Sequence, residues 1–310
     1  MLKSYSFKTP TIVVGNLSVG GTGKTPQIEY LIRFLQEAKN IAVLSRGYKR
    51  KSEGFILASE IDSAETLGDE PYQYFRKFKD ISVCVDSNRV RAIQNLEKLE
   101  NAPEVILLDD AFQHRKVQAG FNILLTSYDK LFYKDCMLPT GDLREPQSGA
   151  NRAHAIIVTK CPDTMDLSQQ KIIEQQLVSK YDKPVFFTNI EYRNEIKGVS
   201  NISLDALKDY EVLLVTGIAK PKPLLDFLTK KRVQFKHLEF PDHHDFSTKD
   251  ILKIEKAYNS LNSKRKLILT TEKDYVRIFA GLKNLHYIEI KTAFIAKEEK
   301  FKKLIKNYVG

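Results

Sequence analysis

The sequence predicts an α/β fold with two parallel-sheet units, and three observations point to it. Short apolar, β-branched runs recur along the chain, amphipathic helical stretches lie between several of them, and the alternation is interrupted once, near residues 186–206. Buried parallel strands typically read as continuous apolar runs that alternate with helices. With 310 residues, the chain is also long enough for two compact units. We therefore expect units at residues 1–185 and 207–310, with a linker of extended strands between them.

The first unit opens with an apolar run, TIVVGN at residues 11–16, which is followed by glycines. Apolar residues then recur at helical spacing from Ile28 to Leu35, so this stretch predicts a strand, a loop and a helix. The same unit is expected to contain strands at 41–45, 81–85, 105–110, 121–126 and 155–160, with helices at 87–99 and 169–181.

The linker and the second unit follow from a change of pattern after residue 185. Residues 185–203 alternate apolar and polar side chains without a helical period, which predicts extended strands. A second series then begins, with strands expected at 211–217, 235–240, 266–271 and 286–290. Helices are expected from Pro223 and from Thr248, and a Lys-rich helix is expected at the end of the chain. The second unit is therefore another α/β unit.

The composition limits the classes of partner without choosing one. The chain has 49 Lys and Arg against 39 Asp and Glu, a net charge of +10, which favours a nucleotide, a nucleic acid or an acidic membrane surface. Three dispersed cysteines without a CxxC spacing argue against a disulfide framework or a zinc site. A reducing cytoplasm fits this pattern best. No apolar run is long enough to predict a signal peptide or a membrane span.

The glycine-rich segment between the first strand and the first helix predicts a phosphate-binding loop of the P-loop type. Its backbone amides would surround phosphate oxygens, the lysine would reach the β and γ phosphates, and the threonine hydroxyl would bind magnesium. Ser18 stands where the full pattern has glycine, and the alternative is a strand-to-helix turn without a ligand. The predicted phosphate-binding residues are Gly20, Gly21, Thr22, Gly23, Lys24 and Thr25.

Two carboxylates end the apolar strand VILLDD, namely Asp109 and Asp110. A P-loop enzyme needs a carboxylate at the end of a neighbouring strand to hold magnesium, so we interpret this pair as a metal site. A solvated pair at a strand end is the alternative.

The segment GDEP places Asp69 and Glu70 at the start of a predicted helix. A carboxylate at that position stabilises the helix N-terminus. It can also accept the proton of an attacking hydroxyl, and the two roles are compatible.

Three further segments supply polar candidates. Arg46 follows a strand and precedes the basic run Lys49–Lys51, where a guanidinium suits phosphate and the lysines suit either solvent or an anionic surface. The segment LPTGDLREP predicts an ordered loop that presents Arg144 and Glu145 to a phosphate and a metal. The segment PDHHDF places His243 just after a strand of the second unit, a setting for a tuned imidazole rather than for zinc.

Taken in order, seven segments resemble the tetraacyldisaccharide 4'-kinase family, the lipid A 4'-kinases of Gram-negative bacteria. They are VGNLSVGGTGKTP, SRGYKR, GDEP, DDAFQHR, LPTGDLREP, VTK and FPDHHDFS, and they cover nearly the whole chain. The resemblance implies two Rossmann-like domains joined by a strand hinge. It also implies transfer of the γ-phosphoryl of ATP, with Mg2+, to the 4'-hydroxyl of a tetraacylated disaccharide 1-phosphate.

The same resemblance implies roles for individual residues. Asp69 becomes the base, paired with His243, and Lys24 and Arg144 face the transferring phosphate. Thr25, Asp109, Asp110 and Glu145 become candidates for the magnesium site. The remaining candidates, without a fixed role, are Glu70, Arg46 and His114.

Family members usually begin with a hydrophobic anchoring helix, whereas this chain starts almost at its first strand. Either the sequence lacks an N-terminal helix that the protein has, or this member binds the membrane peripherally. For the chain as given we expect peripheral contact with the cytoplasmic face of the inner membrane, and no obligate protein partner. The basic run after Arg46 and the apolar residues Leu131, Phe132, Met137 and Leu138 are the expected lipid-facing surface, with core packing as the alternative for the apolar residues.

Two other classes of function remain as alternatives. A P-loop switch GTPase would carry NKxD after a strand such as residues 155–160, but the sequence there reads TKCPD, with Asp163 one residue late. Nucleic-acid binding is supported only by the net charge, because no RNA-binding or helix-turn-helix motif is present. We expect no nucleic-acid partner.

Overall fold

The computed structural model describes residues 4–278 and 282–310, which form two compact units. The first unit comprises the chain up to Glu191 together with Lys291–Gly310, and the second comprises Tyr192–Ile290. The chain leaves the first unit within strand β8 (Val185–Gly198) and returns to it within β13 (Leu285–Ala296). In sequence, the second unit is therefore an insertion into the first, and the predicted α/β fold class is confirmed.

The first unit is built on a parallel sheet with the strand order β8-β7-β6-β1-β5-β2-β4-β3. Only the short β3 runs antiparallel to its neighbour β4 among these pairs. The strands are β1 (Thr11–Asn16), β2 (Ile41–Ser45), β3 (Ile56–Leu57), β4 (Ser82–Val85), β5 (Val105–Asp109), β6 (Phe121–Ser127) and β7 (Ala155–Thr159).

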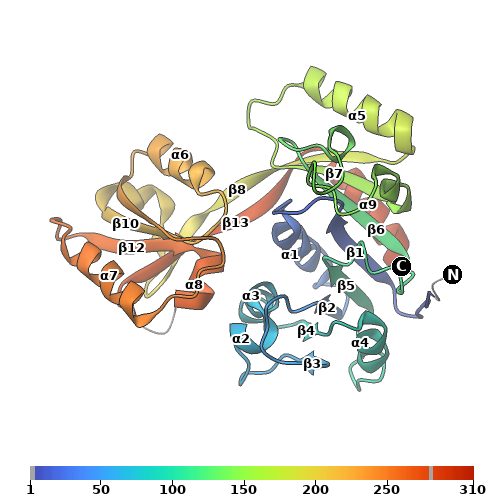
Figure 1. The fold of residues 1–310 in the computed structure, drawn as a ribbon, viewed down its shortest axis with the longest axis horizontal. Helices are drawn as coiled ribbons and strands as arrows, with labels where there is room; N and C mark the ends of the chain where they lie inside the picture. The colour runs from blue at the N-terminus through green and yellow to red at the C-terminus, as the bar shows by residue number, and fades with distance from the viewer. Residues whose placement is uncertain (1–3, 279–281) are drawn as a thin grey trace. The chain divides into compact units, whose positions relative to one another are not determined.

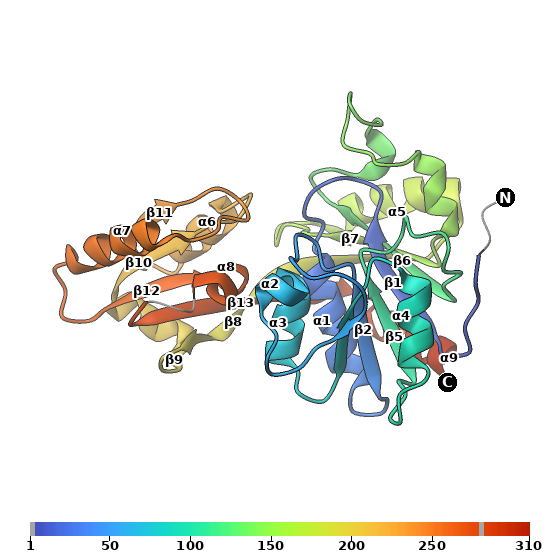
Figure 2. The same cartoon turned by 60° about the horizontal axis from the view of Figure 1, so that its bottom comes forward.

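Helices cover both faces of this sheet (Figures 1 and 2). Alternate residues of β1 point to opposite faces, so Ile12 and Val14 pack with α1, α3 and α9, while Val13 packs with α4 and α5. The helices of this unit are α1 (Lys24–Leu35), α2 (Ala64–Leu67), α3 (Asp69–Lys77), α4 (Arg89–Leu96), α5 (Leu167–Tyr181) and α9 (Glu298–Val309), with 3-10 turns η1 (Phe132–Lys134) and η2 (Gln147–Arg152).

The second unit has a smaller parallel sheet with the order β11-β10-β12-β13. The residues of β10 alternate in the same way: Val212 and Leu214 pack with α6, and Leu213 packs with α7. Its elements are β9 (Ile202–Ser203), η3 (Leu204–Asp209), β10 (Glu211–Thr216), α6 (Lys222–Lys230), β11 (Gln234–Glu239), α7 (Thr248–Asn259), β12 (Lys266–Thr271) and α8 (Glu272–Ile278).

The last helix differs from the predicted division of the chain. That division assigns residues 291–310 to the second unit, but α9 packs in the core of the first, where Phe301 and Ile305 are fully buried. The Tyr308 hydroxyl also accepts a hydrogen bond from the backbone N–H of Thr11 on β1, at 3.0 Å. The apolar residues at four-residue spacing, Phe301, Ile305 and Val309, form the face that this contact buries.

Candidate active site

The predicted site residues of the first unit gather at one edge of its sheet. The glycine loop follows β1, Arg46 follows β2, and the two carboxylates lie at the end of β5. Because these strands are parallel, their carboxyl ends meet at the same edge, which is where open α/β sheets bind ligands.

The glycine loop makes a sharp turn into α1. Gly20 and Gly23 have φ of 91° and 84°, values that a residue with a Cβ rarely adopts. The end of β7 supports the loop from behind: the Thr159 hydroxyl donates to the Thr22 carbonyl at 2.7 Å, and the Lys160 ammonium donates to the Gly21 carbonyl at 2.6 Å. The loop carbonyls are therefore turned toward the sheet, which leaves backbone N–H groups for an anion.

A second loop, residues 138–146, lies against the outer side of the glycine loop. The Val19 N–H donates to the Asp142 carbonyl at 2.8 Å, and the Arg144 N–H donates to the Leu17 carbonyl at 2.7 Å. This is the segment predicted as an ordered loop. Its backbone pairing places the Arg144 side chain at the phosphate-binding edge.

Lys24, Asp110 and Arg144 form a charged cluster at the start of α1. The Lys24 ammonium lies 3.5 Å from Asp110, and the Arg144 guanidinium donates to Asp110 at 3.1 Å and to the Asn16 side-chain oxygen at 2.5 Å. Burial raises the pKa of Asp110, but Lys24 and Arg144 outweigh it, so its pKa falls below the ordinary value. Asp110 thus holds two cations beside the phosphate loop.

Asp109 is the buried member of the carboxylate pair. Its side chain is 5 % exposed, its Oδ2 accepts a hydrogen bond from the Tyr74 hydroxyl at 3.3 Å, and its Oδ1 has no hydrogen-bond partner. Burial, followed by the neighbouring charges of Asp110 and Glu70, raises the pKa of Asp109 to about 7. Tyr74 also shares a side-chain hydrogen bond with Thr25. Sequence reasoning missed Tyr74, because a tyrosine in an amphipathic helix is ordinarily interpreted as a residue of the hydrophobic core.

A divalent cation fits this arrangement of oxygens. The unpartnered Oδ1 of Asp109 is an oxygen ligand that costs free energy when buried alone, and the Thr25 hydroxyl is linked to the same carboxylate through Tyr74. Within residues 4–278 and 282–310, no three His, Cys, Asp or Glu side chains form a complete metal site. Phosphate oxygens and water would therefore complete the coordination, as is usual for magnesium.

Glu145, the fourth predicted metal candidate, is engaged elsewhere. Both of its carboxylate oxygens accept from Arg152, at 2.9 and 2.7 Å, and Oε1 also accepts from the Gln113 side-chain amide at 2.8 Å. The same amide donates to the Asn16 carbonyl at 2.7 Å. In this structure Glu145 ties η2 to the end of β1.

Three basic side chains, Arg46, Arg89 and His114, lie close enough to interact electrostatically, and Arg89 also interacts with Asp109 and Asp110. Arg89 is 3 % exposed and its Nε has no hydrogen-bond partner, and the His114 Nε2 is also without one. Burial, then Arg89, Lys116 and Arg46, lowers the pKa of His114. Sequence reasoning missed Arg89, which begins α4 directly after the capping residue Asn88. The positive charges of Arg46 and Arg89 both contribute to the lowered pKa of His114. This concentration of positive charge would suit an anionic ligand.

Asp69 is the first residue of α3. Gly68 precedes it with φ of 92°, so the chain turns sharply before the helix begins. The predicted helix start at GDEP is therefore observed, and both Asp69 and Glu70 lie in its first turn.

His243 lies in the second unit, three residues after the buried Phe240 and next to Asp242. Its Nδ1 is 2.8 Å from the Arg277 guanidinium, and its Nε2 is 3.1 Å from the Lys273 ammonium. Its backbone N–H donates to the Gly217 carbonyl, at 3.2 Å. Sequence reasoning missed Lys273 and Arg277. The pairing of His243 with Asp69 joins two units and stays a prediction.

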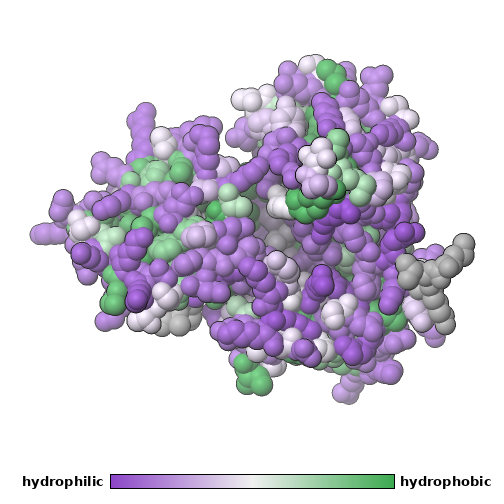
Figure 3. All heavy atoms as spheres, in the orientation of Figure 1, coloured by the Kyte–Doolittle hydropathy of each residue, from purple (hydrophilic) through white to green (hydrophobic). Residues whose placement is uncertain are grey.

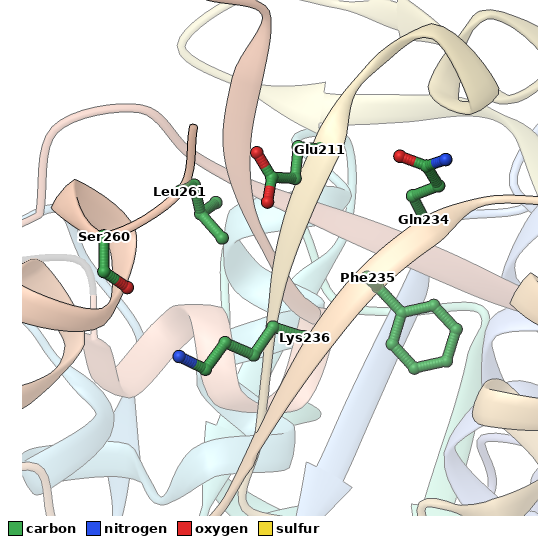
Figure 4. Close-up of a pocket in the computed structure, with 6 residues that line it drawn as sticks. All are labelled: Glu211, Gln234, Phe235, Lys236, Ser260 and Leu261. Carbon is green, nitrogen blue, oxygen red and sulfur yellow. The ribbon is translucent and has the colours of Figure 1, made fainter. Parts of the chain in front are cut away.

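A pocket in the second unit lies apart from these residues (Figure 4). Its lining includes Glu211 and Gln234, which are the first residues of β10 and β11. Ligands of parallel sheets bind at the carboxyl ends of strands, whereas this pocket lies at the amino ends. None of the predicted site residues lines it.

The parallel sheet, the glycine loop leading into Lys24 and Thr25, and the carboxylates at the end of β5 define a P-loop phosphotransferase of the nucleoside-triphosphate-dependent class. The family model of the tetraacyldisaccharide-1-P 4'-kinases matches residues 1–310. The chain belongs to this family, and the predicted resemblance is confirmed.

Individual relatives agree with this assignment. A tetraacyldisaccharide 4'-kinase of Flavobacterium johnsoniae is 52% identical over 312 residues, covering 100% of this chain and 90% of the relative. One of Bacteroides thetaiotaomicron is 46% identical over 289 residues, covering 89% of this chain and 76% of the relative. Among solved structures, LpxK from Aquifex aeolicus in complex with ATP is 33% identical, with a TM-score of 0.78, and the match covers 100% of this chain and 91% of that one.

Proposed function

We propose that this protein transfers the γ-phosphoryl group of ATP to the 4'-hydroxyl of a tetraacyldisaccharide 1-phosphate, in lipid A biosynthesis. The observation that carries the proposal is the cluster of Lys24, Arg144 and Asp110 at the mouth of the glycine loop. Family membership supplies the acceptor, because the relatives are named for this reaction.

Lys24 and Arg144 are assigned to the transferring phosphate. Both are cations held by Asp110, and in the presence of a nucleotide the γ-phosphate offers a competing anion at the same place. The backbone N–H groups of residues 20–25 are assigned to the remaining phosphates.

Thr25 and Asp109 are assigned to Mg2+, with Asp110 as the neighbouring carboxylate. Bound magnesium would neutralise the charge of the phosphates and orient them for attack. We leave Glu145 out of this set, because Arg152 and Gln113 occupy its oxygens.

Asp69 is assigned as the base that accepts the proton of the 4'-hydroxyl, and His243 as the group that orients it. The position of Asp69 at the start of α3 and the family resemblance support this assignment. Arg46, Arg89 and His114 are assigned to the substrate side, because two of them carry unpartnered buried nitrogens that an anionic or hydroxylated ligand would satisfy.

A peripheral membrane contact is the finer part of the proposal. In the part of the chain that the structure describes, no helix has the length and apolar character needed to cross a bilayer. Of the predicted lipid-facing residues, Leu131 and Phe132 are buried in the core of the first unit, which corrects that part of the prediction. Met137 and Leu138 are 45% and 51% exposed, and on the face shown in Figure 3 hydrophobic side chains form small patches among hydrophilic ones.

We therefore place the lipid contact on Met137, Leu138 and the adjacent Val19, which is 42% exposed. Val19 and Leu138 belong to the two loops that pair beside the proposed phosphate site, and Met137 directly precedes the second of these loops. Of the basic run, Lys51 is paired with Glu65 at 2.9 Å, so it contributes less than expected. Flotation with anionic liposomes, comparing the wild type with Met137→Ser/Leu138→Ser, tests this surface. Equal binding would contradict it.

The function itself is tested by transfer from labelled ATP to detergent-dispersed tetraacyldisaccharide 1-phosphate. Transfer is expected in the wild type and not in Lys24→Ala, and Asp69→Ala is expected to lower kcat by about two to four orders of magnitude. Reactions with GTP and without lipid run alongside. Hydrolysis of GTP without any lipid product would favour a switch GTPase and overturn the proposal.

A further inference from the structure

A buried cluster of charged side chains joins α1, the helix that begins with Lys24, to α3, the helix that begins with Asp69. At its centre is Glu29, which is 1 % exposed. Its Oε2 lies 2.8 Å from the Lys77 ammonium and 2.9 Å from the Arg33 guanidinium, and its Oε1 accepts from the Gln73 side-chain amide at 2.9 Å. One carboxylate on α1 thus holds two side chains of α3.

The charge of the Glu29 carboxylate is compensated, and both of its oxygens accept hydrogen bonds or ion-pair contacts. Two cations and an amide surround the single carboxylate, which is the arrangement that a buried charge requires. The Lys77 side chain is itself only 9% exposed. Arg33 also lies over the ring of Phe78, 5.0 Å from its centroid, and Phe78 is the residue that follows α3. The end of α3 is therefore fixed to α1.

The spacing of residues connects this cluster to the active site. Asp69, Gln73 and Lys77 are four residues apart, so they lie along one face of α3. Thr25 and Glu29 have the same spacing on α1. Tyr74, the residue after Gln73 on α3, contacts Asp109 and Thr25. Two successive turns of α3 are thus tied to the helix and the strand that carry the phosphate and metal candidates.

We propose that Glu29 is a positioning residue for phosphoryl transfer, which sets the place of the Asp69 carboxylate relative to Lys24 and the bound nucleotide. This inference rests on the proposed function, because it takes Asp69 as the base. Without the Glu29 contacts, α3 keeps its link through Tyr74 but loses the contacts that fix its rotation and its far end. Misplacement of a reacting group by about 1 Å costs up to about a hundredfold in rate.

The first test compares Glu29→Gln and Lys77→Met with the wild type in the transfer assay. We expect kcat to fall by about 10- to 100-fold, with KM for ATP nearly unchanged. The thermal midpoint is expected to fall as well, because each variant removes one partner of a buried ion pair. Asp226→Asn is the matched control, because Asp226 forms an exposed ion pair with Lys222 at i,i+4 spacing on α6, at 3.6 Å. The control is expected to keep wild-type kcat.

The second test repeats Glu29→Gln in an Asp69→Ala background. If Glu29 acts through Asp69, its removal causes no further loss of kcat once Asp69 is absent. Losses that multiply would contradict the inference while leaving the proposed function intact. A wild type that phosphorylates no lipid would instead overturn the proposed function. Failure of both Glu29→Gln and Lys77→Met to fold would show that the cluster serves stability, and would also overturn the inference.

Discussion

At the scale of single residues, Tyr74 shows how a core side chain serves the site. It is fully buried on α3, and its hydroxyl donates a hydrogen bond to Asp109 Oδ2. The phenol therefore packs like a hydrophobic residue while its oxygen organises the carboxylate. This double role makes its hydroxyl a test of the proposed metal site.

Tyr74→Phe is expected to destabilise the protein by about 1–3 kcal/mol, because it leaves Asp109 Oδ2 without its buried donor. We also expect kcat to fall, because Asp109 and Thr25 lose their shared neighbour. Urea unfolding and steady-state kinetics measure the two effects. Tyr30→Phe, which removes a hydroxyl that donates to Glu298 on α9, is the control for the loss of a phenol oxygen. Wild-type kcat in Tyr74→Phe would show that the hydroxyl is dispensable.

His154 makes stability depend on pH. Its Nδ1 accepts the Asn122 N–H at 2.9 Å, which requires an unprotonated nitrogen, and burial followed by the charge of Lys183 lowers its pKa. The folded state therefore binds fewer protons than the unfolded state near pH 6. This contribution to stability is present above about pH 6.5 and is lost as pH falls below it.

We expect His154→Gln to lower the free energy of unfolding more at pH 7.5 than at pH 5, because only the unprotonated imidazole accepts the Asn122 N–H. Urea unfolding at both pH values measures it. Burial also lowers the pKa of His114 and His286 and raises that of Asp109, so these groups contribute to the pH dependence of stability with opposite signs. The comparison of the variant with the wild type isolates the contribution of His154. An NMR titration that placed the pKa of His154 above 6.5 would contradict the argument.

At the scale of elements, α9 is the clearest case in which local pattern and tertiary placement differ. Its apolar spacing predicts an amphipathic helix, and the helix is present. The spacing does not say which sheet the helix covers, because any apolar surface of suitable shape would suit it. Phe301 packs against Phe186 and Phe294, at ring centroid distances of 5.2 and 4.9 Å, in the first unit.

Phe301→Ala is expected to destabilise the first unit by about 3–5 kcal/mol, because it opens a cavity among buried aromatic rings. Lys303→Ala, an exposed position on the same helix, is the control. Circular dichroism during urea unfolding measures both. A Phe301→Ala effect no larger than that of the control would mean that α9 is not part of this core.

Much of the site was predictable, because phosphate binding imposes a contiguous pattern. The glycine loop, Lys24, Asp110 and Arg144 come from strand-to-loop junctions whose residue types are unusual, and the structure brings them together. Tyr74, Arg89 and Glu29 were not predictable. Tyr74 and Glu29 lie inside helices and Arg89 begins one, and the spacing of each fits an ordinary surface or core position. Their roles depend on neighbours from distant segments.

At the scale of the whole molecule, the two units have separate hydrophobic cores. β10 and its helices pack around Val212 and Leu213, whereas the first unit packs around β1 and β5. Separate cores favour separate cooperative transitions. The nucleotide site proposed above belongs to the first unit, so a nucleotide is expected to stabilise that unit preferentially.

Calorimetry is therefore expected to resolve two unfolding transitions. Phe301→Ala is expected to lower the midpoint temperature of one of them. Mg-ATP is expected to raise the midpoint temperature of that same transition, by an amount that grows with the concentration of Mg-ATP. Mg-ADP at matched concentrations is a comparison ligand without the γ-phosphate. A single transition that shifts as a whole in every case would contradict independent cores.

The return of the chain through β13 to α9 has a consequence for biosynthesis. The sheet edge that carries the proposed phosphate site is complete in sequence by Lys160, yet Phe301, Ile305 and Val309 fill the core beneath β1. A ribosome must therefore translate the whole inserted unit, and then α9, before the core of the first unit can close. Until then the nascent chain exposes apolar strands, and the second unit, whose core is contiguous in sequence, is able to fold first.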